Sequence, residues 1–177
     1  MTEIYDKSFF AGRSETVALS ASVVVQVLMD MISPRSVLDI GCGQGEWIDA
    51  FPIDDKLGVD IAAPEGEKFK AVDLRHPLKL GRTFDLVLCL EVGEHLPAEA
   101  AEQLVESCVL HSNTVVFSAA VPGQEGKGHI NCQPHEYWHA YFSLFEFEYL
   151  DSIRPLIRDS RVSPWYQDNM FLYVHGG

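Results

Sequence analysis

The sequence is poor in basic residues and has no long uninterrupted apolar run. Lys and Arg number 13 against 26 Asp and Glu, which gives a formal net charge of −13. Because nucleic acid is held mainly through its phosphates by basic side chains, this balance disfavours a nucleic-acid partner. The longest apolar stretch, residues 17–32, is broken by polar residues. It is also shorter than the roughly 20 residues that cross a bilayer, so no membrane insertion is expected.

The sequence also lacks paired-cysteine motifs and a recognisable secretion signal. None of the four cysteines forms a C-x-x-C pair, which argues against a zinc ribbon or a disulfide framework. Residues 1–6 lack the basic start and apolar stretch of a secretion signal, so the expected location is the cytoplasm. With 177 residues, no repeat and no linker, the chain is predicted to form a single domain, residues 1–177.

Short apolar segments alternate with helical stretches through most of the chain. Seven of them predict strands, at residues 36–40, 56–60, 69–73, 84–90, 113–118, 147–150 and 170–174. This alternation indicates an α/β three-layer sandwich, with a doubly wound, mostly parallel seven-stranded sheet between helices. The short connection before the last segment contains Pro155 and Pro164 and predicts an antiparallel last strand.

The first predicted strand is followed by a glycine-rich turn, Gly41-Cys-Gly-Gln-Gly45. Ligands of such sheets bind beyond the carboxyl ends of the strands, where this turn lies. Its G-x-G-x-G spacing is one residue tighter than the dinucleotide fingerprint. Glu46 follows at once and would repel a pyrophosphate. The turn therefore favours a ligand without phosphate.

Acidic residues follow the next strands at the same edge of the sheet. Asp60, after the second strand, is placed to accept both hydroxyls of a ribose. Asp73 stands beside Leu74 after the third strand, and this pair suits the amine and the ring face of an adenine. After the fourth strand, the strand-end carbonyls and Glu91 offer acceptors for a cationic group.

Together these segments resemble the class I, seven-stranded S-adenosylmethionine-dependent methyltransferases. The resemblance rests on residues 37–45, 58–60, 72–74 and 84–97, and covers residues 17–120. It implies S-adenosyl-L-methionine as cofactor and S-adenosyl-L-homocysteine as product. The implied cofactor-binding residues are Asp39, Gly41, Cys42, Gly43, Asp60, Ile61, Asp73, Leu74, Leu90 and Glu91.

The same resemblance divides the domain into three parts. Residues 1–33 would form an N-terminal lid and helix, with Tyr5, Phe9 or Phe10 in the lid. Residues 34–120 would form the cofactor-binding half, and residues 121–177 the acceptor-side half.

The second half is expected to bind the methyl acceptor. Gly128-His-Ile-Asn131, followed by Tyr137-Trp138, is similar to methyltransferases encoded with bacterial sugar and surface-polysaccharide genes. This predicts a small-molecule or glycan acceptor, methylated at oxygen, with His129 as the candidate catalytic base. The chain has no sizeable insertion that would cover the site. An uncovered site would suit a large or exposed acceptor, or would be closed by the second subunit of a homodimer.

A divalent metal ion is a further hypothesis for the segment after the fourth strand. Glu91, Glu94 and His95 are spaced to share one helical face, and with His129 they would suit a divalent cation. Some methyltransferases with this segment, acting on RNA 3′ ends or quinone-type rings, place a metal there. In metal-free relatives the same residues cap the turn, so a metal is not favoured.

Two functions of a different kind also fit parts of the sequence. One is a non-catalytic methyltransferase-like binding subunit, against which the intact glycine turn, Asp60 and Asp73 argue. The second is an NAD-dependent oxidoreductase, which shares the first loop and the ribose-binding acid but has a different glycine spacing.

Overall fold

The computed structural model describes residues 7–177, with side chains from residue 15 onward. The lid residues Tyr5, Phe9 and Phe10 lie outside the part whose side chains are described, so that expectation stays a prediction.

One mixed sheet forms the centre of the described chain. Its strands are β1 (Ser36–Ile40), β2 (Asp55–Asp60), β3 (Phe69–Ala71), β4 (Leu86–Leu90), β5 (Thr114–Ser118), β6 (Phe147–Leu150) and β7 (Phe171–His175). They lie in the order β3-β2-β1-β4-β5-β7-β6. β7 is antiparallel to both of its neighbours, whereas the other pairs are parallel. The predicted α/β sheet with an antiparallel last strand is confirmed.

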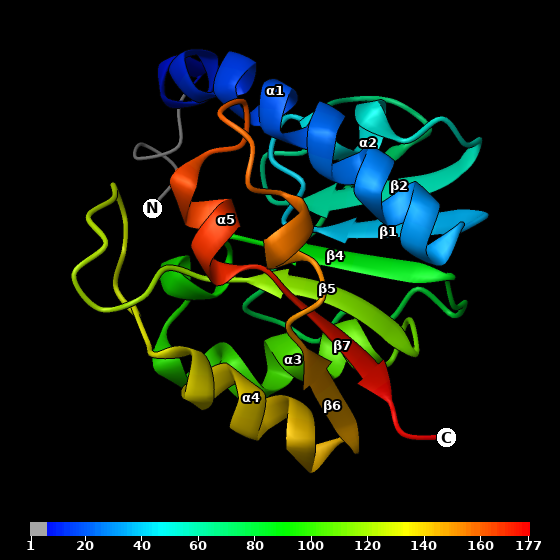
Figure 1. Cartoon of the computed structure of the whole chain (residues 1–177), viewed down its shortest axis with the longest axis vertical. Coiled ribbons are helices and arrows are strands. Elements are labelled where there is room, and N and C mark those ends of the chain that lie inside the picture. The colour runs from blue at the N-terminus through cyan, green and yellow to red at the C-terminus, as the bar shows by residue number, and fades with distance from the viewer. Residues whose placement is uncertain (1–6) are drawn as a thin grey trace.

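Helices cover both faces of this sheet (Figure 1). One face carries α1 (Lys7–Ile32), α2 (Glu46–Ala50) and α5 (Pro164–Asn169), and the other carries α3 (Ala101–Val109) and α4 (His135–Leu144). Short 3₁₀ turns lie in the connections: η1 (Gly93–His95), η2 (Ala98–Ala100) and η3 (Arg154–Leu156).

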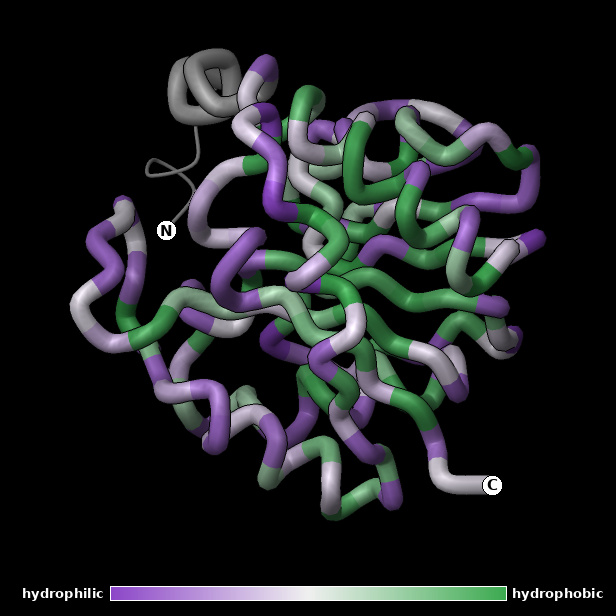
Figure 2. Tube along the Cα trace, viewed as in Figure 1, coloured by the Kyte–Doolittle hydropathy of each residue, from purple (hydrophilic) through white to green (hydrophobic). Residues whose placement is uncertain are grey.

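The two faces of the sheet bury separate apolar clusters, because successive strand residues point to opposite sides. In β4, Leu86, Leu88 and Leu90 pack with α1, α2 and α5. Val87 and Cys89 of the same strand pack with α3 and α4. All five are buried, which explains why this strand is an uninterrupted apolar run and appears green in Figure 2.

Helix α1 is the one described segment that is long and apolar enough, by length and composition alone, to cross a membrane. The segment is Glu15–Ile32, with a mean hydropathy of 1.5. Here it packs one face against α2 and the sheet: Ala21, Val24 and Leu28 are fully buried. Leu19, on the outer face, is 47% exposed. In this structure the segment packs one side against the core, and 28% of it is buried.

The sheet has one topological switch point, between β1 and β4. From β1 the chain proceeds outward through β2 to β3, and from β4 it proceeds in the opposite direction to β5. The connections after β1 and β4 therefore run to opposite sides of the sheet, and ligands of open α/β sheets bind at such a point.

We predict that Trp138→Ala destabilises the fold strongly. Trp138 is 2% exposed, and its ring packs on Phe117 with centroids 5.0 Å apart. It also covers Gly93 so closely that an added Cβ there would lie 2.4 Å from the ring. Removing such a side chain costs about 3–5 kcal/mol. Urea unfolding checks this, with the 67% exposed Leu144→Ala as the control. A Trp138→Ala loss as small as the control's would contradict this packing.

We also predict that acid weakens the attachment of α4 to the sheet. His139 stacks on Tyr149 with ring centroids 3.8 Å apart, and its Nδ1 lies 2.6 Å from the Tyr173 hydroxyl. Burial lowers the pKa of His139 to about 4. The unfolded chain therefore binds more protons between about pH 6.5 and 4, so the free energy of unfolding falls over that interval. In His139→Gln, denaturant unfolding between pH 7 and 4 is expected to show a smaller fall. An unchanged pH dependence would refute this role.

Candidate cofactor and acceptor site

The glycine-rich turn after β1 lies tightly against the neighbouring strand. The N–H groups of Gly41 and Cys42 both donate to the Val59 carbonyl, at 2.7 and 3.1 Å. Gly41 and Gly45 have φ of 84° and 93°, in the left-handed region that glycine adopts without strain. A Cβ on Gly41 would lie 2.3 Å from Val92, and one on Gly45 would lie 2.5 Å from Phe69. Glycine is therefore required at both positions.

The Asp60 carboxylate, at the end of β2, organises this turn. It accepts hydrogen bonds from the Gly43 N–H at 3.1 Å and from the Ala62 N–H at 2.8 Å. Each oxygen thus takes one backbone donor, and each keeps a second lone pair. The residue predicted to bind ribose hydroxyls is held in place with acceptor capacity remaining.

Asp39 and Cys42, also predicted to lie at the cofactor, are both buried. Asp39 is 1% exposed, and its Oδ2 has no hydrogen-bond partner among the described residues. Burial, and then the negative charges of Asp60 and Glu46, raise the pKa of Asp39. Burial also raises the pKa of the Cys42 thiol, so this cysteine is a packing residue and not a nucleophile.

The predicted adenine-side residues differ in their surroundings. Leu74 is buried at 8% exposed, whereas Ile61 is 55% exposed. Arg75 binds the Asp73 carboxylate through both Nε and Nη2, and this pairing lowers the pKa of Asp73 to about 2. Arg75 therefore competes with the predicted adenine amine for the Asp73 carboxylate.

The strand-end residue Glu91 has an unusual backbone. Its φ is 56°, and its N–H donates to the Ser118 carbonyl at 2.9 Å. Its side chain turns inward, where Oε2 accepts a 3.1 Å hydrogen bond from Gln124, while Oε1 has no partner among the described residues. A non-glycine residue in the left-handed region costs of order 1 kcal/mol and is often found at functional sites.

The segment 121–133 carries the candidate base and is fastened to the turn after β4. The N–H groups of Ile130 and Asn131 donate to the Glu94 carbonyl, at 2.8 and 3.0 Å. Gln124 joins the loop to two more parts of the protein, because it donates to Glu91 and accepts from Asn169 of α5. The acceptor-side loop is thus anchored beside the carboxyl end of β4.

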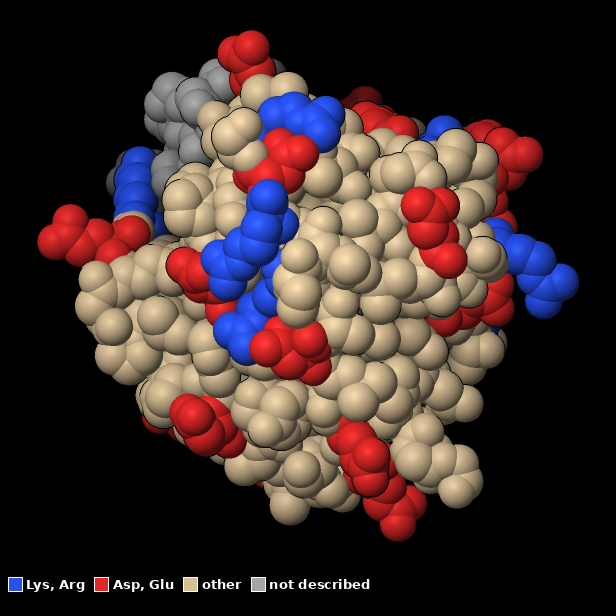
Figure 3. Space-filling model, in the orientation of Figure 1, with Lys and Arg blue, Asp and Glu red and all other residues tan. Residues whose placement is uncertain are grey.

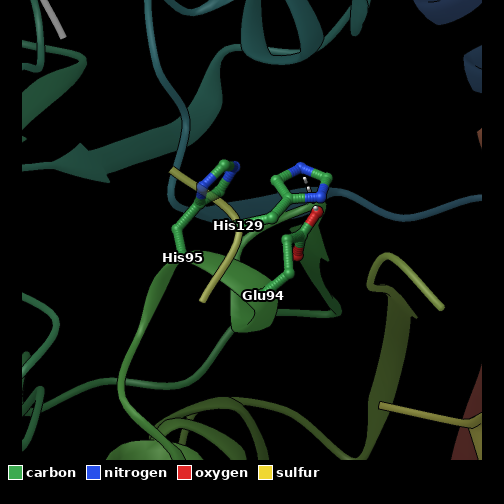
Figure 4. Close-up of side chains that lie close together, drawn as sticks. All are labelled: Glu94, His95 and His129. Atoms are coloured by element: carbon green, nitrogen blue, oxygen red, sulfur yellow. Dashed lines mark ion pairs between the residues drawn. The ribbon is translucent and has the colours of Figure 1, made fainter. Parts of the chain in front are cut away.

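Three side chains gather where this loop meets η1: Glu94, His95 and His129 (Figure 4). One ligating atom of each lies within 4.8 Å of the others. His129 Nε2 is 4.0 Å from Glu94 Oε1. Glu94 is fully buried, and neither carboxylate oxygen has a hydrogen-bond partner among the described residues. Burial, and then the nearby charge of Glu91, raise the pKa of Glu94.

This cluster differs in part from the metal set that the spacing suggests. Glu94 and His95 do meet His129, as the metal hypothesis requires. Glu91 is not part of the group; its carboxylate is engaged by Gln124. Sequence reasoning missed the link between Gln124 and Asn169, because residues 45 positions apart carry no local signal of their pairing.

The remaining histidines and arginines of the acceptor-side half have structural partners. His135 Nε2 lies 3.1 Å from Asn169 Oδ1, and His139 is held by Tyr173. The arginines Arg154, Arg158 and Arg161 pair with Asp151, Asp168 and Asp159, respectively. On the face shown in Figure 3, basic and acidic side chains lie next to one another. These arginines therefore form no unpaired basic patch.

Comparison with known proteins decides the family. Residues 18–107, about half of the chain, match a family model described as a methyltransferase domain.

The chain belongs to this family.

Solved structures of other proteins share the fold described above. DesVI of Streptomyces venezuelae has a TM-score of 0.68 at 19% identity, with 98% of each chain covered. The sugar N-methyltransferase KedS8 from Streptoalloteichus sp. ATCC 53650 has a TM-score of 0.66 at 20% identity, with 94% of this chain and 91% of that chain covered. Magnesium protoporphyrin IX methyltransferase ChlM from Synechocystis PCC 6803, with bound S-adenosylhomocysteine, has a TM-score of 0.63 at 16% identity, with 94% and 87% covered. No curated protein matches the sequence.

The expected class I methyltransferase family and its Rossmann-like fold are thereby confirmed. An NAD-dependent oxidoreductase is not supported. The individual cofactor and acceptor residues stay predictions, to which the geometry above adds detail.

Arg75→Ala tests whether Asp73 is tied up by its neighbour. Losing the guanidinium should raise the pKa of Asp73 from about 2 toward the ordinary value near 3.9. Carboxyl ¹³C chemical shifts followed over pH give this pKa directly. Arg82→Ala, which removes a comparable pair with Asp55, should leave Asp73 unchanged. An Asp73 pKa that stays near 2 in Arg75→Ala would refute the pairing.

Proposed function

We propose that the chain transfers a methyl group from S-adenosyl-L-methionine to an oxygen of a small-molecule or glycan acceptor. The observation that carries this proposal is the arrangement at the switch point. The glycine turn and Asp60 lie on the β1 and β2 side, and the loop with His129 is fastened to the turn after the adjacent strand β4.

The residues at this edge fit the cofactor. Gly41 and Gly45 present bare backbone where a side chain would collide with its neighbours. Asp60 holds spare acceptor capacity for ribose hydroxyls, and exposed Ile61 and buried Leu74 offer apolar surface for a base. The buried carboxylate oxygens Asp39 Oδ2 and Glu91 Oε1 lack partners among the described residues and suit a cationic ligand group. When bound, S-adenosylmethionine would supply an electrophilic methyl group on its sulfonium.

In this proposal His129 acts on the acceptor as the base. Its Nδ1 lies 3.0 Å from the Gln124 carbonyl, which can only accept, so Nδ1 carries the proton. The lone pair of the neutral ring is then on Nε2, the atom that faces Glu94. In the proposed reaction the acceptor hydroxyl gives its proton to Nε2 as its oxygen bonds to the methyl carbon and the carbon–sulfur bond breaks. The pair of electrons of that bond stays on the neutral thioether.

Sequence resemblance, a shared fold and the acidic composition support a small-molecule or glycan acceptor. The sequence after β5 is similar to sugar-cluster methyltransferases, and the fold is shared with KedS8, a sugar N-methyltransferase. The 26 acidic residues make a polyanionic acceptor a poor match. Closure of the site by a second copy of the chain is part of the same proposal.

Asp60→Ala tests the cofactor site. Loss of a charged hydrogen-bonding group costs about 1.5–3 kcal/mol, so the affinity for S-adenosylmethionine should fall roughly ten- to hundredfold. Calorimetry measures this in wild type and variant. Glu65→Ala removes an exposed carboxylate from the same loop and should bind as wild type does. Failure of the wild type to bind either S-adenosylmethionine or S-adenosylhomocysteine would refute the proposal.

His129→Gln tests the acceptor side. A panel of hydroxyl-bearing sugars and sugar nucleotides is incubated with S-adenosylmethionine, and formation of S-adenosylhomocysteine is measured. Loss of a general base should lower kcat by about 10²–10⁴ while cofactor affinity stays within a few-fold. His76→Gln, an exposed histidine after β3, is the control. Full turnover in His129→Gln would rule out that histidine as the base.

A further inference from the structure

The cluster at η1 has the composition and the hydrogen bonding of a metal site. Its members come from two segments that the chain brings together: Glu94 and His95 from the turn after β4, and His129 from the loop after β5. Figure 4 shows the Glu94 carboxylate and the His129 ring turned toward each other, with His95 beside them.

Both imidazoles are held in the tautomer that a metal ligand needs. His129 Nδ1 lies 3.0 Å from the Gln124 carbonyl, and His95 Nδ1 lies 3.2 Å from the Gly128 carbonyl. Because a carbonyl accepts only, each Nδ1 carries the proton and each Nε2 carries the lone pair. The Cys132 thiol is farther from His129 Nδ1, at 3.5 Å, and does not change this assignment. Metal-binding histidines are regularly oriented by such Nδ1 donation to backbone carbonyls.

The third member, Glu94, is a fully buried carboxyl group with no hydrogen bond to either oxygen among the described residues. A buried carboxylate in that state is costly unless it is paired or coordinates a metal. Glu91 lies close enough to act on this carboxyl group, and His129 Nε2 is 4.0 Å from Glu94 Oε1.

We propose that Glu94, His95 and His129 bind one first-row transition-metal dication, such as Zn²⁺ or Mn²⁺, through Glu94 oxygen and the two Nε2 atoms. Two imidazole ligands favour such transition-metal cations, Zn²⁺ above Mn²⁺, over Mg²⁺ or Ca²⁺, which prefer oxygen. The ligating atoms lie within 4.8 Å of one another. Bonds of about 2.0–2.1 Å place ligands about 3.4 Å apart, so side-chain rotations that close the cluster by roughly an ångström complete the site.

Three protein ligands leave coordination positions open. The cation would sit beside Glu91, at the end of the strand next to the predicted cofactor, and its open position would take an acceptor oxygen. There it would make the acceptor hydroxyl more acidic. The base role proposed above for His129 Nε2 then applies to the metal-free chain, because the same lone pair binds the cation in the loaded one. Binding of the cation is independent of methyl transfer, whereas this role rests on the proposed function.

Metal binding to the full chain tests the proposal. After dialysis against a chelator, Zn²⁺, Mn²⁺ and Mg²⁺ are titrated separately by calorimetry, and bound metal is counted by elemental analysis. One Zn²⁺ or Mn²⁺ per chain is expected, bound at least tenfold tighter than Mg²⁺. Glu94→Gln and His129→Gln should each weaken Zn²⁺ binding at least about a hundredfold. Circular dichroism confirms that both variants fold.

A second histidine–glutamate pair offers a matched control. His175 Nε2 lies 3.9 Å from Glu146 Oε2 on the surface, nearly the same separation as at the buried cluster. His175→Gln should leave Zn²⁺ binding unchanged. No stoichiometric binding in the wild type, equal binding in Glu94→Gln, or a Mg²⁺ affinity matching that of Zn²⁺ would each overturn the proposal.

Titration of S-adenosylmethionine into the chelator-treated chain separates the two proposals. Cofactor binding without Zn²⁺ binding leaves the proposed function standing and removes the metal site. Zn²⁺ binding without cofactor binding supports the metal site and refutes the proposed function.

Discussion

The parallel pairing of β1 with β4 is the constraint on which the rest of the site depends. These strands come from segments about fifty residues apart, joined in register at Val37–Leu86, Leu38–Val87 and Asp39–Leu88. Because both strands end at the same edge, the glycine turn and the turn after β4 face each other across the switch point. If the register slipped by one residue, every side chain of β4 would change face, which two separate apolar clusters do not permit.

The acceptor side depends on a different kind of contact. Much of the segment 121–133 has no regular secondary structure, and backbone hydrogen bonds to the Glu94 carbonyl hold it against the turn after β4. The carbonyls of that same loop then orient His95 and His129. A single peptide segment therefore sets the ring orientation and the tautomer of both imidazoles, so the geometry of the cluster depends on the loop as well as on its side chains.

The strands and the glycine turn were predictable because their signals are local. Buried strands are continuous apolar runs, and β1 and β6 have the bounds that their runs predict. β3 ends at Ala71, two residues before the predicted end, since it is a short strand at the edge of the sheet. The link from Gln124 to Asn169 could not be foreseen, because it depends on how two distant segments meet in space. The Asp73–Arg75 pair is local, but it depends on a turn conformation that the sequence does not specify. Glu94 was a candidate from spacing, but only the structure shows that it is buried and that its oxygens lack hydrogen-bond partners among the described residues.

The backbone and side-chain conformation of Glu91 lowers the stability of the fold. It carries a side chain at φ 56°, where glycine would fit without strain, and it keeps one carboxylate oxygen buried without a partner among the described residues. Backbone and burial both make this residue unfavourable for folding alone. Selection of variants for heat resistance, with no demand for turnover, would therefore replace this residue among the first. A thermostable descendant obtained that way would keep the sheet and lose the carboxylate predicted to face the cofactor.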